Sequence, residues 1–279
     1  MPDALRRTLR VGWVLVFLSA ASCAAPPVRN QGQFDFAREL VGRSTTEDRL
    51  SQYGNAANER MRPFFASAGI DFPPASVVLV GLKYERELQV YAGRSPEELS
   101  YVRSYPILAA SGFPGPKLAE GDRQVPEGIY EVESLNPNSR HHLALRVGYP
   151  NAYERQIGEM EDRADLGGDI MIHGGASSAG CLAIGDTSAE ELFILAAQVG
   201  IEQMEVVIVP VDFRLRPQIP AEAWDVPDAA TRAVLEPPDW TPGLYRRLRA
   251  RLAALPLPSE PERVGDAVVL AAKSMRPTQ

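Results

Sequence analysis

A histidine and a cysteine lie eight residues apart in this chain, as His173 and Cys181, and a loop rich in glycine and serine separates them. The thiolate of cysteine is its nucleophilic form, and a free cysteine is mostly thiol near neutral pH. An imidazole within hydrogen-bond reach can remove that proton and give a thiolate–imidazolium pair. We therefore interpret Cys181 as a candidate nucleophile and His173 as its candidate base.

Small residues precede the cysteine, so backbone N–H groups there can approach a substrate carbonyl. The N–H groups of Ala179, Gly180 and Cys181 are candidates for an oxyanion hole. A histidine and a cysteine at this spacing are weak evidence on their own, and a buried, unreactive cysteine is the alternative. With three histidines and no cluster of cysteine and histidine, we expect no zinc site, and we interpret His141 and His142 as surface or loop side chains.

Short β-branched and aromatic runs separated by Gly, Pro and Asn turns predict several strands. These runs cover residues 77–80, 88–91, 101–108, 128–132, 142–147, 170–173 and 206–211. Many short strands at such spacing favour a sandwich or barrel. We interpret Lys117 and Asp122 as turn residues between two of them.

Helical patterns flank this region and follow the cysteine. A capping box of Thr187 and Glu190 predicts the start of a helix shortly after Cys181. Residues 24–75 form an N-terminal extension with two helical stretches, which either packs on the main domain or acts as a spacer. Residues 215–279 are proline-rich and contain one basic helix at 245–254. The expected fold class is mainly β with α additions (α+β).

Residues 1–23 have the order of an export signal and should not be read as fold. A positive start is followed by the apolar run 11–20, which is too short to span a bilayer stably, and then by small residues and Cys23. Cys23 resembles the lipid-bearing cysteine of a lipoprotein, although Ala20 stands where leucine is usual. The alternative is plain cleavage that leaves the mature chain free in the periplasm.

The export signal leads us to expect a periplasmic protein, anchored by lipid at the periplasmic face of the outer membrane. If Cys23 is lipidated or removed, Cys181 has no partner for a disulfide, and a lone thiol in an oxidising compartment is a liability unless its reactivity is used. By itself this residue favours a buried, unreactive cysteine, and its neighbours are what favour catalysis. The formal net charge of −7, from 29 basic and 36 acidic residues, argues against nucleic acid as a partner.

The segment around His173 and Cys181 resembles the signature of the YkuD-type L,D-transpeptidase catalytic domain, a His-Gly followed by Ser-x-Gly-Cys. The eight-residue spacing is similar to that of the YafK-like branch of this family. Upstream motifs recur in the same order: Gly115-Pro116-Lys117, Gly121-Asp122, Pro126–Tyr130, Asn136–Ser139 and Tyr149-Pro150-Asn151. The resemblance covers about residues 76–214 and implies an L,D-transpeptidase-like β-sandwich or barrel with helical extensions at both ends.

By this resemblance Cys181 is the nucleophile and His173 the base, which a backbone carbonyl near Gly174 orients. Ser178 matches the family serine and either supports the loop or donates to substrate. Many relatives have histidine where Ala179 stands, and arginine or asparagine at the position of Ala183. These departures point to an acyl acceptor other than that of classical cross-linking.

The resemblance implies a cysteine-dependent acyl transfer on peptidoglycan stem peptides. The thiolate would attack the carbonyl of the third residue, a diaminopimelate, and an amine or water would take the thioester. No cofactor or metal is required, and a monomer is expected. With water as acceptor the protein is an L,D-carboxypeptidase or amidase. The remaining alternatives are a non-catalytic wall-binding lipoprotein and a structural periplasmic protein.

Overall fold

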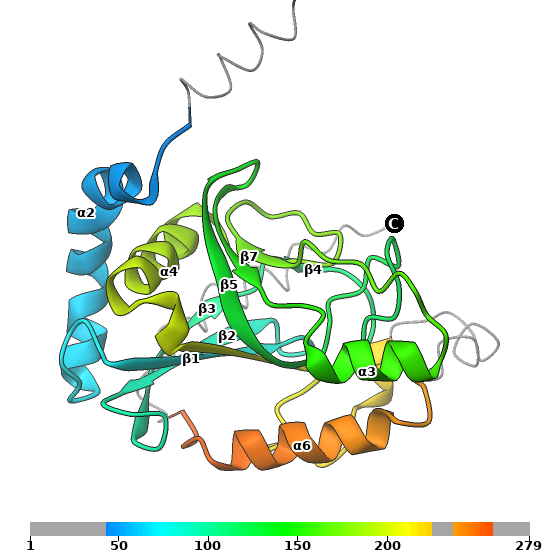
Figure 1. The fold of residues 1–279 in the computed structure, drawn as a ribbon. Helices are drawn as coiled ribbons and strands as arrows, with labels where there is room; N and C mark the ends of the chain where they lie inside the picture. Colours follow the sequence, from blue (N-terminus) through cyan, green and yellow to red (C-terminus); the bar gives the residue numbers. More distant parts are fainter. Residues whose placement is uncertain (1–42, 225–236, 259–279) are drawn as a thin grey trace, which may run out of the picture. The chain divides into compact units, whose positions relative to one another are not determined.

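A computed structural model describes residues 43–224 and 237–258, and its strands form one mixed sheet in the order β3-β2-β1-β9-β5-β6-β7-β8-β4 (Figure 1). The strands are β1 (Ser76–Leu82), β2 (Glu87–Gly93), β3 (Leu99–Pro106), β4 (Ala109–Ala110), β5 (Gly128–Ser139), β6 (His142–Val147), β7 (Met171–His173), β8 (Leu182–Ala183) and β9 (Met204–Val209). The helices are α2 (Thr46–Ser67), α3 (Ala152–Met160), α4 (Asp186–Val199) and α6 (Thr241–Ala253), with short 3₁₀ turns η1 (Ile201–Gln203) and η2 (Ala221–Trp224). The expected α+β class is confirmed.

The central strand β1 is buried on both faces, which explains its uninterrupted apolar sequence. Successive side chains of a strand point to opposite faces. Val77 and Leu79 accordingly join the core that includes α2 and α4, whereas Val78 and Val80 join a second core with Leu248 of α6. Figure 1 shows α6 on the side of β1 opposite to α2 and α4.

Strand β5 joins the two parts of the sheet. Its first residues, 128–131, pair with β9, and its later residues pair with β6. The part beyond β5 contains β6, β7, β8 and β4, and it carries both candidate catalytic residues, His173 at the end of β7 and Cys181 just before β8. The long strand therefore connects the site to the main core.

Two helix predictions are corrected. The two expected N-terminal stretches are one continuous helix, α2, even though Pro63 lies inside it. Ala57, Met61 and Phe65 follow one another at four-residue intervals and are all buried, so a single apolar stripe holds the helix together. The Thr187 capping box is absent, because α4 begins at Asp186 after Gly185 and has no side-chain cap.

Helix α3 was not predicted from the sequence. Its N-cap is Asn151, which forms a capping box with Glu154. The glutamate side chain is buried and also accepts a hydrogen bond from the hydroxyl of Tyr130. Burial raises the pKa of Glu154, and the bonds from Tyr130 and from the backbone of Asn151 oppose that shift.

The export signal and the lipidation site at Cys23 lie outside the described residues. The division into extensions and catalytic domain stays a prediction, although α2 of the N-terminal extension packs on α4. Within the described ranges, none of the helices combines the length and apolar character that crossing a bilayer requires.

The buried carboxylate of Glu191 ties α2, α4 and β3 together. It accepts from Arg60 Nε at 2.6 Å, from Arg103 Nη1 at 2.8 Å and from the hydroxyl of Tyr105 at 2.7 Å. Only 3% of its side chain is exposed. A buried charge needs such partners, and a partner that loses its opposite charge is left without compensation.

We predict that Glu191→Ala lowers the free energy of unfolding by about 3 kcal/mol, because two guanidinium groups lose their buried partner. Urea denaturation of the purified protein measures this change. Glu59→Ala is the control, since this glutamate is exposed on the same helix as Arg60, and it should change stability by less than about 0.5 kcal/mol. Equal effects of the two substitutions would contradict the assigned role of Glu191.

Candidate active site

His173 and Cys181 are carried by two neighbouring parallel strands. In the register of β7 and β8, His173 pairs with Ala183. Cys181 immediately precedes β8. Continuing the same register by one residue puts Cys181 opposite Met171, which lies two residues before His173. Paired residues and residues two apart share a sheet face, so the thiol and the imidazole lie on the same face, one diagonal step apart.

The sulfur of Cys181 is partly exposed and lies against the backbone that leads into β7. Its Sγ is 3.6 Å from the carbonyl oxygen of Asp169. Burial raises the pKa of the Cys181 thiol, the Asp169 carboxylate raises it further, and the Met171 N–H and the Lys117 ammonium lower it. Among the described residues, no hydrogen bond joins Sγ to the His173 ring.

The ring of His173 is buried, with 2% of the residue exposed, and its Nδ1 lies 2.6 Å from the carbonyl oxygen of Gly174. Since a carbonyl only accepts, Nδ1 must carry the proton, which leaves Nε2 as the basic nitrogen of the neutral ring. Burial lowers the pKa of His173, and the bond to Gly174 opposes that shift. This is the orientation expected for the base, whose catalytic role remains a prediction.

The close packing around Gly174 requires a glycine. A Cβ atom there would lie 2.5 Å from Asp186 Oδ1 and 2.7 Å from the carbonyl oxygen of His141. Asp186 also accepts a hydrogen bond of 2.7 Å from the N–H of Gly175. The start of α4 therefore fixes the turn that presents the carbonyl to His173.

Both pKa shifts favour the neutral forms of the pair. A raised thiol pKa and a lowered imidazole pKa keep Cys181 as thiol and His173 as imidazole near neutral pH. The expected thiolate–imidazolium pair is therefore not the resting state that this structure favours. The imidazole is instead available to take the proton when the sulfur attacks.

The neighbouring histidine His141 was interpreted as a surface or loop residue, but its exposed ring stacks on the ring of His173. The ring centroids are 4.4 Å apart and the planes meet at 22°. His142, by contrast, points to Glu190, at 3.0 Å, and to Tyr53. The contact follows from the pairing of β6 with β7, which no local pattern in the sequence reports.

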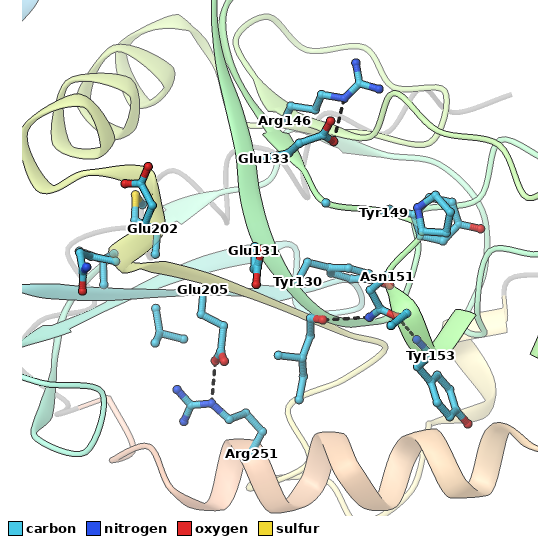
Figure 2. A pocket seen from close by; sticks show the side chains of 18 of the residues that line it. Tyr130, Glu131, Glu133, Arg146, Tyr149, Asn151, Tyr153, Glu202, Glu205 and Arg251 are labelled. Atoms are coloured by element: carbon cyan, nitrogen blue, oxygen red, sulfur yellow. Dashed lines mark hydrogen bonds and ion pairs between the residues drawn. The ribbon is translucent and has the colours of Figure 1, made fainter. Parts of the chain in front are cut away.

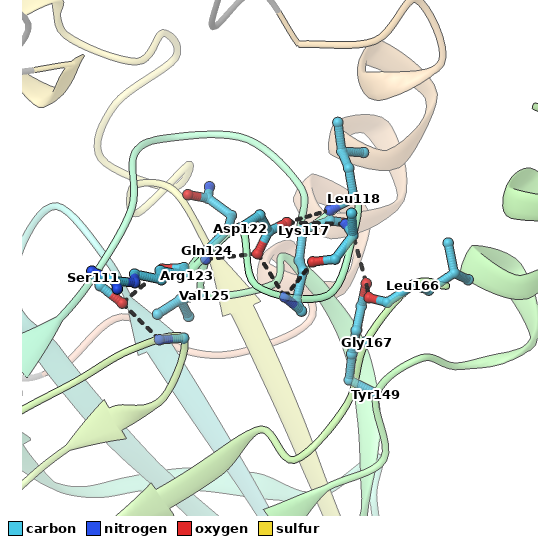
Figure 3. A network of polar contacts seen from close by, with 12 residues as sticks. Ser111, Lys117, Leu118, Asp122, Arg123, Gln124, Val125, Tyr149, Leu166 and Gly167 are labelled. Carbon is cyan, nitrogen blue, oxygen red and sulfur yellow. Dashed lines mark hydrogen bonds and ion pairs between the residues drawn. The ribbon is translucent and has the colours of Figure 1, made fainter. Parts of the chain in front are cut away.

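A serine that the sequence did not single out, Ser111, organises the loop before Cys181. Its Oγ accepts from the N–H of Gly180 at 2.7 Å and donates to the carbonyl of Arg123 at 2.7 Å (Figure 3). Its N–H donates to Ser178 Oγ at 3.2 Å, and Ser178 donates in turn to the carbonyl of Cys181 at 2.7 Å. Ser178 thus supports the loop, which is one of its two expected roles.

These contacts correct one part of the expected oxyanion hole. The N–H of Gly180 is engaged by Ser111 and is not available to a substrate oxygen in this structure. Gly180 has a φ of 112°, a conformation that favours glycine, so it shapes the loop. In the described part of the chain, no acceptor is bonded to the N–H of Cys181 or Ala179, and both remain candidates.

Lys117 and Asp122 close a turn, as expected. Lys117 Nζ lies 2.6 Å from Asp122 Oδ1, and the other carboxylate oxygen accepts from the N–H groups of Leu118 and Ala119 (Figure 3). Across the described ranges, no group of three or more His, Cys, Asp or Glu side chains is placed to hold a metal ion.

We predict that alkylation of Cys181 by iodoacetamide accelerates about tenfold per pH unit from pH 6 to 8.5, because the thiolate fraction rises in that proportion below a raised pKa. Rates on the folded protein should stay below those of the urea-unfolded chain at pH 7, since burial no longer raises the thiol pKa after unfolding. A plateau of reactivity below pH 7 would show a preformed thiolate and contradict this resting state.

Comparison with known proteins identifies the domain that holds these residues. The sequence model of the YkuD family, an L,D-transpeptidase catalytic domain, matches residues 76–209. Two relatives, both named "Putative L,D-transpeptidase YafK", come from Escherichia coli K12 and O157:H7. Each is 39% identical over 113 residues, which is 40% of this chain and 43% of the relative. The match thus spans less than half of the relatives' length.

Two solved structures have lower similarity. The helical cell shape determining protein Pgp2 from Campylobacter jejuni is 21% identical, with a TM-score of 0.38 over 53% of this chain and 54% of that chain. L,D-transpeptidase 1 from Mycobacterium tuberculosis is 14% identical, with a TM-score of 0.28 over 48% of this chain and 62% of that chain. The strands that carry His173 and Cys181 lie inside residues 76–209, the segment of this chain that matches the YkuD family of L,D-transpeptidase catalytic domains.

Proposed function

We propose that this protein is a cysteine-dependent L,D-transpeptidase or related peptidoglycan peptidase that works through a thioester on Cys181. The observation that carries the proposal is the placement of Cys181 and His173 on one face of two paired strands. The carbonyl of Gly174 accepts a hydrogen bond from Nδ1 of His173. This contact fixes the tautomer and leaves Nε2 as the basic nitrogen of the ring.

The first step transfers the acyl group to the enzyme. His173 Nε2 takes the thiol proton as Cys181 Sγ bonds to the carbonyl carbon of the diaminopimelate residue. The N–H groups of Cys181 and Ala179 stabilise the oxyanion. The C–N bond then breaks, and the imidazolium gives its proton to the departing amine of D-alanine.

The second step releases the acyl group. An amine of another stem peptide, or water, gives a proton to His173 and attacks the thioester, and the cysteine leaves as thiol. Because no hydrogen bond joins the two side chains at rest, substrate binding must bring them into contact, as is common for catalytic pairs in structures without ligand. Alanine at positions 179 and 183 favours water or an unusual amine as acceptor.

The proposed location follows from the substrate. Peptidoglycan lies outside the cytoplasmic membrane, so an enzyme acting on it must be exported, and residues 1–23 have the order of an export signal. We place the mature protein in the periplasm as a monomer, held at the membrane by lipid on Cys23.

We predict that Cys181→Ala abolishes turnover of purified muropeptides, because no thioester can form. We predict that His173→Gln lowers turnover by about 100-fold to 10,000-fold, the loss that a missing general base gives. Product masses separate new cross-links from simple cleavage. His142→Gln is the matched control, since this adjacent histidine contacts Glu190 and not the thiol. Full activity of the Cys181→Ala protein would exclude a cysteine enzyme.

Ser111→Ala should reduce kcat between about 10-fold and 100-fold with little change in KM, because it frees Gly180 and Ser178 and lets the nucleophile loop shift. Steady-state kinetics on the same muropeptides measure the two constants. Ser177→Ala is the comparison, an exposed serine in the same loop that should retain wild-type rates. An unchanged kcat in Ser111→Ala would contradict the role of Ser111 in positioning the loop before Cys181.

A further inference from the structure

A cavity of about 960 Å³ opens beside strand β5, between the start of α3 and the C-terminal helix α6 (Figure 2). Its wall carries charges of both signs: Glu131, Glu133, Glu202 and Glu205, with Arg146, Arg155, Arg247 and Arg251. Two tyrosines, Tyr149 and Tyr153, add aromatic surface. Such a lining suits a ligand that itself bears both carboxylates and amines.

One lining residue, Arg146, connects the cavity to the nucleophile. It pairs with Met171 in the register of β6 and β7, and Met171 comes opposite Cys181 on the other side. Arg146, Met171 and Cys181 therefore form one row across the sheet and point to the same face. Neighbouring strands are about 4.8 Å apart, so the backbone of Arg146 lies roughly 10 Å from that of the cysteine.

The guanidinium of Arg146 is only partly used by its protein partners. Its Nε lies 3.1 Å from Glu133 and its Nη1 lies 2.5 Å from Asp169. Both partner side chains are exposed, by 53% and 76%, and exposed pairs of this kind are weak. Its third nitrogen, Nη2, has no hydrogen-bond partner among the described residues.

We propose that Arg146 is a subsite for a free carboxylate of the stem peptide. The proposal rests on the proposed function, because it places the acyl donor along the row from Arg146, at the wall of the cavity, to Cys181, which does not line the cavity itself. Arginine binds carboxylates through charge-assisted N–H bonds, and the N–H groups of Nη2 can offer them without displacing Glu133 or Asp169. Arg251 differs, since Glu205 already pairs with it at 2.6 Å.

A second link between Arg146 and the nucleophile runs through Asp169. Its partner Asp169 also provides the carbonyl that Cys181 Sγ contacts. A carboxylate bound at Arg146 would thus be held beside the segment that positions the sulfur. The subsite would select stem peptides with a free acid close to the scissile bond over peptides in which that acid is an amide.

The test compares a stem tetrapeptide with variants in which one carboxylate at a time is a carboxamide. With the wild-type full-length protein, one of these carboxamides should lower kcat/KM about tenfold, through KM, the scale of a lost charge-assisted hydrogen bond. Arg146→Ala should reduce this discrimination to less than twofold, and Arg146→Lys should retain part of it. The control variant is Arg62→Ala, because Arg62 lies in α2 and stacks on Phe72. It should discriminate between the acid and the carboxamide peptides as the wild type does.

Two results would overturn the subsite: a wild-type protein that treats all the peptides alike, or an Arg146→Ala protein that still discriminates tenfold. An Arg146→Ala protein whose kcat/KM falls equally on the acid and the carboxamide peptides would also overturn the subsite. Arg146 would then act only by positioning Asp169. Calorimetric binding of the same peptides to Cys181→Ala, with and without Arg146→Ala, decides the matter without turnover. Absence of wild-type turnover alone would contradict the proposed function, and circular dichroism verifies that each variant is folded.

Discussion

The parallel pairing of β7 with β8 is the constraint on which the site depends. It brings together two residues separated by a seven-residue loop, and it points the thiol and the imidazole to one face of the sheet. Both strands are short, so the loop and the start of α4 must help to hold them. The N–H of Ile184 donates to the carbonyl of His173 at 2.9 Å, and the N–H of Gly185 donates to that of Gly175 at 3.0 Å.

The same arrangement sets the electrostatics of the pair. The ring is buried and the sulfur is partly buried, and this burial favours each group in its neutral form. A neutral pair is a resting state that can accept a substrate carbonyl without a preformed charge. In the proposed mechanism the charge arises only as the sulfur attacks, and the backbone N–H of Cys181 would then stabilise the oxyanion while the Gly174 carbonyl would stabilise the imidazolium.

Much of the fold could be predicted because its strands are marked by local patterns. The runs 77–80 and 206–211, for example, are apolar on both faces. They correspond to the central strands β1 (Ser76–Leu82) and β9 (Met204–Val209), with somewhat different bounds. The helix after the cysteine was predicted, but not its start, since Asp186 bonds to the distant loop residue Gly175 and not to the helix itself. The packing of the N-terminal helix on α4 and β3 includes the contact of Arg60 with Glu191, more than a hundred residues away in sequence, which no local pattern reports.

The site shows the same division between local and distant information. Cys181, His173 and the carbonyl of Gly174 could be inferred from one segment and a family resemblance. Ser111, His141 and Arg146 could not, because each reaches the site through strand pairing or a contact with a distant loop. The hydrogen bond from the N–H of Gly180 to Ser111 could not be predicted either, because the sequence does not report the acceptor of a backbone N–H.

The central claim is a covalent thioester on Cys181, and mass spectrometry of the protein tests it most directly. The protein is mixed with a stem tetrapeptide, quenched in acid within milliseconds to seconds and digested. The proposed mechanism predicts that the peptide containing Cys181 gains the mass of the tripeptide acyl group, and that hydroxylamine removes this mass. Turnover of the tetrapeptide with no such adduct, or with the adduct on another residue, would contradict it.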